Sequence, residues 1–429
     1  MEQKFRNLLE GDRQAEAILV SVFPKDEDRI EREASFAELQ RLLETAGGKV
    51  FAKVIQMKDH PENATYLGSG KLEELSALCR DGGIELVVCD DELSPIQIKN
   101  LENALGGDVL VIDRTMLILD IFALHAVTSD GKLQVELAQL KYSAPRLVGK
   151  GKQLSRLGGG IGTRGPGESK LESDRRHLKE RIRLLEDQLD ALSKNREVQR
   201  RQRARSGVFR FSIAGYTNAG KSTLLNALTG AGVKEKDELF ATLDPTTRKY
   251  ELPSGTEILL TDTVGFIRNL PHHLVKAFRS TLDEVTTSDA VLLVLDVSDP
   301  EADAQLRVTL DLLSELGARD KPILCVLNKC DLAETFFMPF NLGGEGLETI
   351  SISAKTGQGI DRLVEKLEEI SGRGKRRVTL VFPHDKLGLI SRLYDDCANV
   401  EVEYTVEGAI VTADLDKASL GRYAAFIKE

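Results

Sequence analysis

Glycine, lysine and serine recur in residues 211–223 at a spacing that suits phosphate binding. The apolar stretch FSIA leads into Gly215, Gly220, Lys221 and Ser222, and the helix-forming sequence TLLNALTG follows. This is the GxxxxGK[ST] pattern in its strand–loop–helix context. Such a loop wraps phosphates with backbone N–H groups, and the helix N-terminus adds positive potential. The predicted nucleotide-binding residues here are Gly215, Tyr216, Thr217, Asn218, Ala219, Gly220, Lys221, Ser222 and Thr223.

Each polar residue of this loop has an expected task. Lys221 would reach the β- and γ-phosphates, and the Ser222 hydroxyl would coordinate Mg²⁺. A second motif, TEILLTDTVG (256–265), is an apolar strand that ends in Asp262-x-x-Gly265. Asp262 is placed to hold the Mg²⁺ ion through a water molecule, and the Gly265 N–H can meet the γ-phosphate.

Two further strand ends predict the base. PILCVLNKCD (322–331) ends in Asn328, Lys329 and Asp331. A carboxylate there can accept from both N1–H and the 2-amino group of guanine, a pair that adenine lacks, so an unpaired buried carboxylate would reject adenine. ISISAKTG (350–357) adds Ser353, Ala354 and Lys355, which can close over the base. Four motifs in this order predict a site for GTP and GDP.

The elements that must position these motifs alternate between strands and helices from about Val208 to Ser371. The same alternation fills residues 16–125, with strands predicted at 17–23, 50–57, 84–90 and 108–113 and helices at 36–43, 71–79 and 94–105. Such alternation predicts parallel sheets covered by helices on their faces. Residues 16–125 contain no catalytic constellation. Their YLGSGK segment (66–71) would form either a tight turn or an anion site at a helix N-terminus.

Between these regions the pattern is helical. Residues 132–148 predict a helix at least as far as Pro145, and residues 168–205 predict a long, charged helix. Its apolar positions mostly alternate at spacings of three and four, as in a coiled-coil seam: Leu171, Leu178, Ile182, Leu185, Leu189 and Leu192. We therefore expect a helical hairpin whose tip is the glycine-rich segment LGGGIGTRGPGE (157–168).

The tip has two interpretations. Gly160, Gly162 and Gly165 match the spacing of a dinucleotide-binding loop, but no strand precedes them, so that interpretation fails. The tip is then either a mobile connection or a loop that approaches RNA, with positive charge from Arg156, Arg164 and Lys170. The helix ends in a basic stretch, Lys194, Arg196, Arg200, Arg201, Arg203 and Arg205, which is either an RNA contact or a linker.

The fold class is therefore multidomain α/β. We expect an N-terminal parallel α/β domain (1–130), a helical hairpin with a glycine-rich tip and linker (131–206), a P-loop domain (207–372) and a small C-terminal α/β domain (373–429). In the last of these, the pattern predicts a strand, a helix over Lys386–Tyr394 and two more strands.

Composition narrows the setting. The 429 residues carry a net charge of −10, which argues against binding nucleic acid over the whole surface. No apolar run approaches the roughly 20 residues of a membrane span, and the charged start MEQKFRNLLEGDRQ has no signal-peptide core. The five cysteines show no metal-ligand spacing, so we expect free thiols in a reducing cytoplasm. We also expect the protein to be monomeric and not inserted in a membrane.

The motifs together resemble the HflX-type ribosome-associated GTPases, a group related to translation-factor GTPases. The most specific marks are GGGIGTRGPGE, GYTNAGKST, FATLDPTTR and DTVGFI, and the likeness runs from the N-terminal domain through residue 371. It implies GTP hydrolysis and binding to the large ribosomal subunit and its RNA, in splitting or rescue of stalled ribosomes. One alternative is a regulatory switch that binds a protein partner through the N-terminal domain without RNA. A minor alternative is a second nucleotide site, for ATP, in the N-terminal domain, with RNA remodelling as its output, although no P-loop is found there.

The resemblance also assigns roles to single residues. It implies that FATLDPTTR (240–248) is the first switch, in which Thr242 would bind Mg²⁺ only in the GTP state. Thr246 and Thr247 are alternatives, and ordinary turn chemistry would equally explain three threonines in one loop. The implied metal ligands are thus Ser222, Thr242 and Asp262.

Position 266 departs from the Ras-like pattern. Ras-like enzymes place a water-orienting glutamine there, whereas Phe266 cannot polarise water. We therefore expect slow intrinsic turnover that a partner accelerates. In similar GTPases an asparagine at the position of Asn218 helps to hold a K⁺ ion against the phosphates. The alternative is that Asn218 only shapes the loop. The predicted catalytic set is Lys221, Thr242, Gly265 and Asn218.

Overall fold

The computed structural model describes residues 15–24, 29–147, 166–205, 208–230, 239–240, 242–269, 279–332, 347–372, 376–415 and 417–428. The chain divides into two compact units. The first unit comprises Met1–Leu192, Lys236–Asp244 and Arg268–Arg279, and the second unit comprises Ser193–Glu235, Pro245–Ile267 and Ser280–Glu429. The α/β fold class is confirmed.

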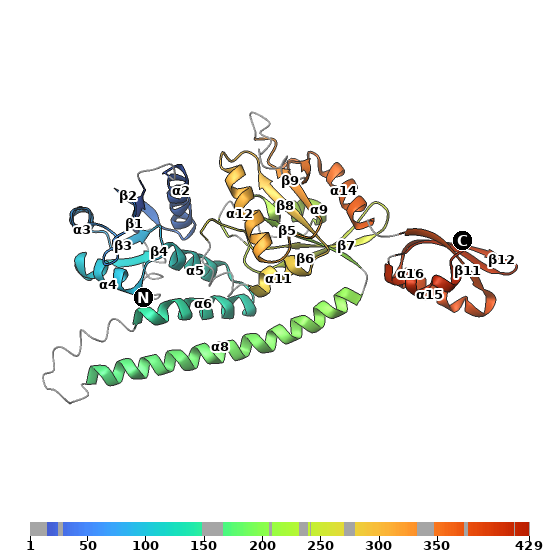
Figure 1. The fold of residues 1–429 in the computed structure, drawn as a ribbon, viewed down its shortest axis with the longest axis horizontal. Coiled ribbons are helices and arrows are strands. Elements are labelled where there is room, and N and C mark those ends of the chain that lie inside the picture. Colours follow the sequence, from blue (N-terminus) through green and yellow to red (C-terminus); the bar gives the residue numbers. More distant parts are fainter. Residues whose placement is uncertain are drawn as a thin grey trace. The chain divides into compact units, whose positions relative to one another are not determined.

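A four-stranded parallel sheet forms the centre of the first unit (Figure 1). Its strands are β1 (Glu16–Phe23), β2 (Lys49–Met57), β3 (Leu86–Cys89) and β4 (Leu110–Asp113), in the order β2-β1-β3-β4. All residues of β3 and β4 are buried, and so are all of β1 except the first. Continuous apolar runs are typical of strands that helices cover on both faces.

The helices between these strands are α2 (Arg29–Thr45), α3 (Ser69–Gly82) and α4 (Pro95–Ala104). In the segment YLGSGK, Tyr66 pairs with Glu62 in a turn and has a φ of 63°, Gly68 is the N-cap of α3, and Ser69–Lys71 begin that helix. A fourth helix, α5 (Arg114–His125), was not predicted. Its sequence is apolar nearly all round, so it lacks the 3.6-residue period, and it follows β4 directly because Asp113 caps it through the Met116 N–H at 2.9 Å.

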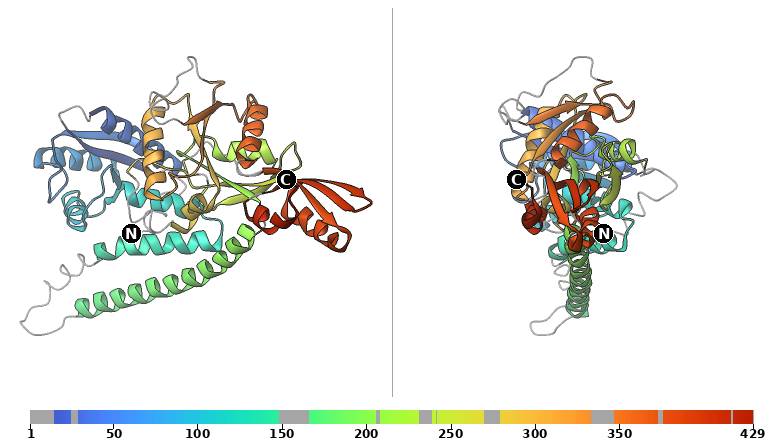
Figure 2. Two further views of the ribbon diagram at one scale, coloured as in Figure 1. Left: turned by 45° about the vertical axis from the view of Figure 1, so that its right-hand side comes forward. Right: turned by 90° about the vertical axis from the view of Figure 1, so that its right-hand side faces the viewer.

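The helical hairpin is formed by α6 (Ser129–Leu147) and α8 (Pro166–Arg205), which run side by side in opposite directions (Figures 1 and 2). Leu185 is fully buried, and the other described seam positions are partly covered while their neighbours are exposed: Leu178, Ile182, Leu189 and Leu192. Arg181 pairs with Glu136 and Lys141 with Glu186, both at 2.7 Å. The predicted seam is thus confirmed over 178–192, and most of the glycine-rich tip lies outside the described residues.

The second unit contains a six-stranded sheet in the order β10-β9-β8-β5-β7-β6. Its strands are β5 (Phe209–Gly215), β6 (Thr246–Glu251), β7 (Glu257–Asp262), β8 (Ala290–Asp296), β9 (Ile323–Asn328) and β10 (Glu348–Ser351). Only β6 is antiparallel to its neighbour. The other five strands therefore bring their carboxyl ends to one edge of the sheet.

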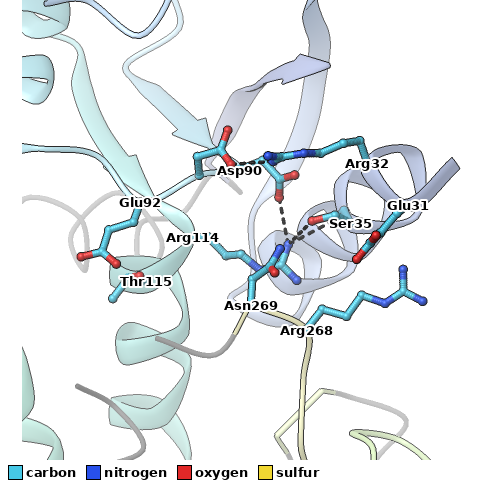
Figure 3. Close-up of a pocket in the computed structure, with 10 residues that line it drawn as sticks. Glu31, Arg32, Ser35, Asp90, Glu92, Arg114, Thr115, Arg268 and Asn269 are labelled. Carbon is cyan, nitrogen blue, oxygen red and sulfur yellow. Dashed lines mark hydrogen bonds and ion pairs between the residues drawn. The ribbon is translucent and has the colours of Figure 1, made fainter. Parts of the chain in front are cut away.

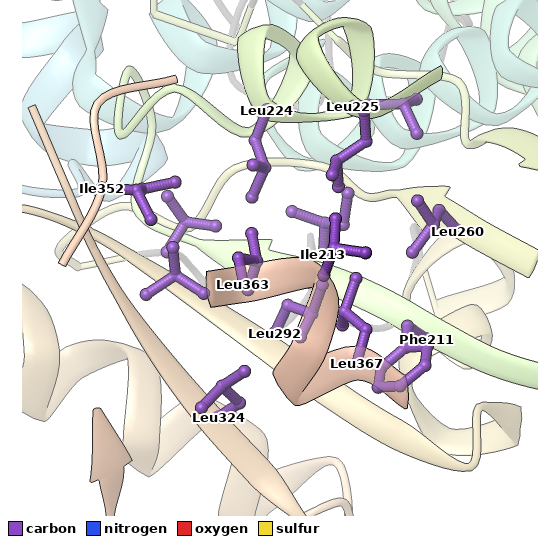
Figure 4. Packing of buried hydrophobic residues seen from close by; sticks show 14 of the residues in the cluster. Phe211, Ile213, Leu224, Leu225, Leu260, Leu292, Leu324, Ile352, Leu363 and Leu367 are labelled. Atoms are coloured by element: carbon purple, nitrogen blue, oxygen red, sulfur yellow. The ribbon is translucent and has the colours of Figure 1, made fainter. Parts of the chain in front are cut away.

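The helices of this unit are α9 (Lys221–Thr229), α11 (Arg279–Thr287), α12 (Ala302–Glu315) and α14 (Ile360–Gly372). Figure 4 shows how they close the core: Leu224 of α9 and Leu363 and Leu367 of α14 pack against Ile213 and Leu292 of the sheet. This packing fixes the strand ends from which the site is built.

The C-terminal residues form a separate antiparallel sheet in the order β11-β13-β12. It comprises β11 (Arg376–Pro383), β12 (Ala398–Thr405) and β13 (Gly408–Leu415), with helices α15 (Gly388–Asp396) and α16 (Lys417–Arg422) and the short helices η2 (His384–Lys386) and η3 (Ala424–Phe426). The predicted strand, helix and two strands are present, whereas α16 was not predicted. The four domain ranges remain a prediction.

Two expectations about composition can also be compared with the structure. None of the described helices combines the length and apolar character that crossing a bilayer requires. All five cysteines are free, and within the described residues no cluster of His, Cys, Asp and Glu could hold a metal ion. Burial raises the pKa of Cys325 to about 12, which makes its thiol a poor nucleophile.

Candidate nucleotide site

The loop between β5 and α9 curls around the Lys221 side chain. Lys221 is only 6% exposed, and its Nζ donates a hydrogen bond to the Tyr216 carbonyl at 2.7 Å. Gly220, the residue before the helix, has a φ of 92°. Asn218 also lies in the left-handed region, with a φ of 62°, and its side chain is exposed. The motif therefore forms the strand, loop and helix that the sequence predicted.

Neighbouring strands fix the walls of this loop. The Thr217 N–H donates to the Phe266 carbonyl at 2.8 Å, and the Phe266 N–H donates to the Gly215 carbonyl at 3.0 Å. On the other side, a Cβ atom on Gly215 would stand 2.2 Å from the Val294 carbonyl oxygen of β8. The loop is thus held by backbone contacts on both sides, in a conformation that side-chain bulk at position 215 would not permit.

Five of the predicted residues converge at the start of α9. The Ser222 hydroxyl donates to the Asp262 carboxylate at 2.7 Å, and Asp262 is fully buried. A Cβ on Gly265 would lie 3.0 Å from Lys221 Nζ and 2.8 Å from the Thr217 methyl carbon. A hydroxyl and a carboxylate side by side are oxygen donors of the kind that Mg²⁺ prefers, so this pair fits that ion.

Burial perturbs the one cation at the centre of the loop. It lowers the pKa of Lys221 from 10.5 to about 8, while the negative charge of Asp262 opposes this shift. A buried ammonium group with few compensating charges is poorly stabilised by the protein alone. A bound anion would stabilise its charged form.

The predicted base-recognition residues lie at the ends of β9 and β10. Asn328 is nearly buried and connects two motifs, because its Nδ2 donates to the Ala219 carbonyl at 2.9 Å and its Oδ1 accepts from the Ala354 N–H at 2.9 Å. Ser353 is also buried and accepts from the Thr356 N–H at 3.1 Å. Asn328 and Ser353 therefore hold the loops in place.

The remaining members of these motifs are accessible. Asp331 and Lys355 are exposed, as a contact to a base requires, while Ala354 is nearly buried. Lys329 pairs with Asp296 at 2.6 Å. Asp296 was not among the predicted site residues, although its position at the end of the apolar run AVLLVLD carried the same signal as Asp262. Thr223 lies in the first turn of α9 and is partly covered.

The three candidate switch threonines differ in position. Thr242 belongs to the first unit, so its role as a metal ligand remains a prediction. Thr246 stands opposite Asp262 in the register of β6 and β7. Thr247 shares a hydrogen bond with the Thr261 hydroxyl at 3.0 Å, which gives Thr247 a role in the sheet. Phe266 is 1% exposed.

Comparison with known proteins gives this site its context. Residues 33–123 match the family model of the GTP-binding GTPase N-terminal region, residues 125–203 that of the GTP-binding GTPase middle region, and residues 210–329 that of the 50S ribosome-binding GTPase. The GTPase HflX of Lacrimispora saccharolytica is 49% identical over 92% of each chain. The GTPase HflX of Caldanaerobacter subterraneus is 49% identical over 93% of this chain and 90% of its own.

This chain belongs to the HflX family of GTPases. It therefore binds GTP and hydrolyses it, and the P-loop of the second unit is the nucleotide-binding element. Among solved structures, a GTP-binding protein from Sulfolobus solfataricus in complex with GDP is 28% identical and covers 84% of this chain and 99% of its own. Its TM-score of 0.44 is too low to support an argument about individual residues of this HflX-family chain.

A second polar cavity, of about 380 Å³, lies in the first unit (Figure 3). Its charges are largely paired with one another: Arg32 contacts Asp91 at 2.6 Å, and Arg114 contacts both Asp90, at 2.9 Å, and Glu38. Burial raises the pKa of Asp90, and the charge of Arg114 opposes the shift. No P-loop lines this cavity, and its ion pairs join α2 to the residues that follow β3 and to the start of α5.

Proposed function

We propose that this HflX-family GTPase associates with the large ribosomal subunit during its GTP cycle and acts in splitting or rescue of stalled ribosomes. The observation that carries the proposal is the hairpin of α6 and α8, attached to a GTPase domain that matches the 50S ribosome-binding GTPase model. With 40 residues, α8 is ~60 Å long. Over residues 175–194, where its side chains are described, the covered positions are those of the seam, which leaves charged faces available to a large partner.

The proposed binding of the nucleotide follows the geometry of the second unit, except for the role of Thr242, which the family resemblance implies. Lys221 and the backbone of 215–223 hold the phosphates, and the Gly265 N–H meets the γ-phosphate. Ser222 and Asp262 hold Mg²⁺, with Thr242 as an additional ligand in the GTP state. When bound, the ion neutralises charge on the phosphate oxygens. These assignments are supported by the 2.7 Å contact of Ser222 with Asp262 and by the low exposure of Lys221.

Guanine recognition is assigned to Asp331, with Lys329 and the 353–355 loop against the base. The support is that Asp331 is exposed, whereas Asn328 and Ser353 are buried and fix the loops on either side. An ionised carboxylate matched to two donors of guanine gives the selectivity, because adenine would leave it unpaired.

We propose that Asn218 helps to hold a K⁺ ion against the phosphates, where the ion partly replaces an arginine finger. Its side chain is exposed at the mouth of the loop, and Phe266 offers no polar group to an attacking water. Turnover in K⁺ buffer should exceed turnover in Na⁺ buffer, and Asn218→Ala should remove that difference. Equal rates of the unaltered protein in both salts would leave Asn218 a role in loop shape alone.

The deciding experiment measures GTP turnover with and without purified large ribosomal subunits, in K⁺ buffer, at two salt concentrations. We expect strong stimulation that weakens as salt rises, because contacts of Lys and Arg with RNA phosphates depend on salt. Deletion of Gly158–Gly167 should abolish it. A matched control replaces three exposed basic residues outside the hairpin, Arg80, Arg362 and Arg392, with glutamine, and should retain it.

The second candidate function is a regulatory switch that binds a protein partner and no RNA. Slow turnover that ribosomal subunits do not change would favour it and would leave the GTPase assignment intact. We also propose that the protein acts as a monomer in the cytoplasm, where its ribosomal partner would be found.

A further inference from the structure

The segment that precedes β6 is packed into the first unit. Of its described residues, Leu239 is 6% exposed and Phe240 and Leu243 are each 2% exposed. The ring of Phe240 meets that of Phe122 in α5 edge to face, with centroids 4.6 Å apart. Phe240 also has a φ of 57°, a conformation that bulky residues adopt only when their surroundings impose it. We name residues 239–244 the anchor segment.

Asp244 ends the anchor segment and binds the two residues just before α6, of which Thr128 caps the helix. Its carboxylate accepts hydrogen bonds from the Val127 N–H at 3.0 Å, the Thr128 N–H at 2.8 Å and the Thr128 hydroxyl. The same hydroxyl accepts from the Gly131 N–H at 3.0 Å, as an N-capping side chain does. A negative charge at this end of a helix is also stabilised by the helix dipole.

The fit around this carboxylate is close. A Cβ atom on Gly131 would stand 2.5 Å from Asp244 Oδ1, so any side chain at position 131 would displace the carboxylate. The anchor segment is therefore held in the first unit by the packing of its aromatic ring and by the contacts of the Asp244 carboxylate, for which the missing side chain of Gly131 leaves room.

The chain enters the first unit again just after β7. Arg268 and Asn269, two and three residues beyond Phe266, line the polar cavity together with Ser35 and Arg114 (Figure 3). Both ends of the β6–β7 segment, which carries Asp262 and Gly265, are thus continuous with residues packed into the first unit.

We propose that Asp244 is a positioning residue for GTP hydrolysis. It fixes the anchor segment, and with it Thr242, to the start of the hairpin helix α6, so that the nucleotide state and the hairpin are coupled. This rests on the proposed role of Thr242 as a switch ligand. Thr242 lies two positions before Asp244, and Thr246, which stands opposite Asp262 in the sheet, lies two positions after it. Holding Asp244 therefore restricts the positions open to Thr242.

The test compares kcat and KM for GTP in three variants of the full chain. Asp244→Asn removes the charge, Thr128→Val removes the hydroxyl, and Gly131→Ala displaces the carboxylate without changing any charge. Each should lower kcat about threefold to tenfold and leave KM within about twofold, because the P-loop is untouched. Alanine forms helix better than glycine, so Gly131→Ala does not weaken α6 itself.

Controls separate positioning from damage to the fold. Asp130→Asn removes the same charge from the first turn of α6 and should keep the normal kcat, and Thr128→Ser, which retains a hydroxyl, should too. In the unaltered protein, amide exchange over 127–131 should differ between GDP and a non-hydrolysable GTP analogue. That difference should vanish in Asp244→Asn, whereas a merely structural cap would show no dependence on nucleotide.

The variant Thr242→Ala separates the proposed role of Thr242 as a ligand from the positioning role of Asp244. A normal kcat in Thr242→Ala would overturn the ligand assignment and, with it, the inference. A low kcat in Thr242→Ala, beside a normal kcat in both Asp244→Asn and Gly131→Ala, would overturn the inference alone. A raised kcat in the anchor variants would also overturn it, because the cap would then restrain hydrolysis.

Discussion

Two sheets in this chain, one parallel and one parallel except for β6, carry charged residues near the carboxyl ends of their parallel strands, and the charges at the two edges are compensated in different ways. In the first unit, Arg114 faces Asp90 and Glu38, so cation and carboxylates stabilise each other. In the second unit, Lys221 donates to a backbone carbonyl, and burial lowers its pKa to about 8. A network that stabilises the fold pairs its own charges, whereas a ligand site keeps a charge that its ligand must stabilise.

The largest effect is expected when the charge network of Arg114, Asp90 and Glu38 in the first unit is broken. Arg114→Met would leave Asp90 and Glu38 without their cation and should lower the free energy of unfolding of the first unit by about 3–5 kcal/mol. Hydrogen exchange at the β1 and β3 amides measures it. Arg29→Met, which breaks an exposed pair with Glu33, should cost less than about 1 kcal/mol. Equal losses in the two variants would contradict the distinction between the edges.

The same substitution at the ligand site should act in the opposite direction on the fold. Lys221→Met should weaken GTP binding on the order of 100-fold to 1,000-fold, because a charge-assisted contact to the phosphates is lost. It should also stabilise the nucleotide-free protein by about 1–3 kcal/mol, since a buried charge is removed. Calorimetry and thermal unfolding measure the two effects. Lys249→Met, at an exposed position, is the control for both.

A smaller effect is expected for the choice of base. Asp331→Asn should shift the preference from guanine toward xanthine by about 100-fold, because the amide cannot accept from both guanine donors. Competition between GDP and XDP measures the shift, with Asp320→Asn as an exposed control. Retained guanine selectivity would disprove the assignment of Asp331.

The smallest expected effect is the uptake of a fraction of a proton when the nucleotide binds. Above pH 8 the nucleotide-free Lys221 is mostly neutral, and a bound phosphate raises its pKa, so binding GDP should take up a proton. The uptake should be roughly 0.7 proton at pH 8.5 and about 0.1 at pH 7 for a pKa of about 8. Calorimetry in buffers of different ionisation enthalpy measures it. Uptake that does not change with pH would place the charge elsewhere.

The two edges also differ in how far the sequence predicts them. The residues of the nucleotide site belong to short contiguous motifs at strand ends, so the sequence alone predicts them. The charge network joins Arg32 and Arg114 to the adjacent residues Asp90 and Asp91, and thus brings together three segments that are far apart in the sequence. No local pattern relates these positions, because only the order β2-β1-β3-β4 brings them together.

The remaining differences have local causes. Helix α5 was missed because burial nearly all round removes the period that marks an amphipathic helix. The sequence marks Asp244 only as one residue of a switch motif, although its carboxylate binds the backbone just before a helix more than one hundred residues earlier in the chain. A contact across that distance leaves no trace in the spacing of residues.

The close approach of Gly215 to β8 affects how mutants of this loop should be interpreted. A side chain at position 215 would collide with the Val294 carbonyl whether or not a nucleotide is present. An inactive Gly215 variant would thus report misassembly of the sheet rather than the contribution of the loop to catalysis. Lys221 and Ser222 are the informative positions for genetic experiments, and loss-of-function phenotypes at Gly215 belong with those of core mutations.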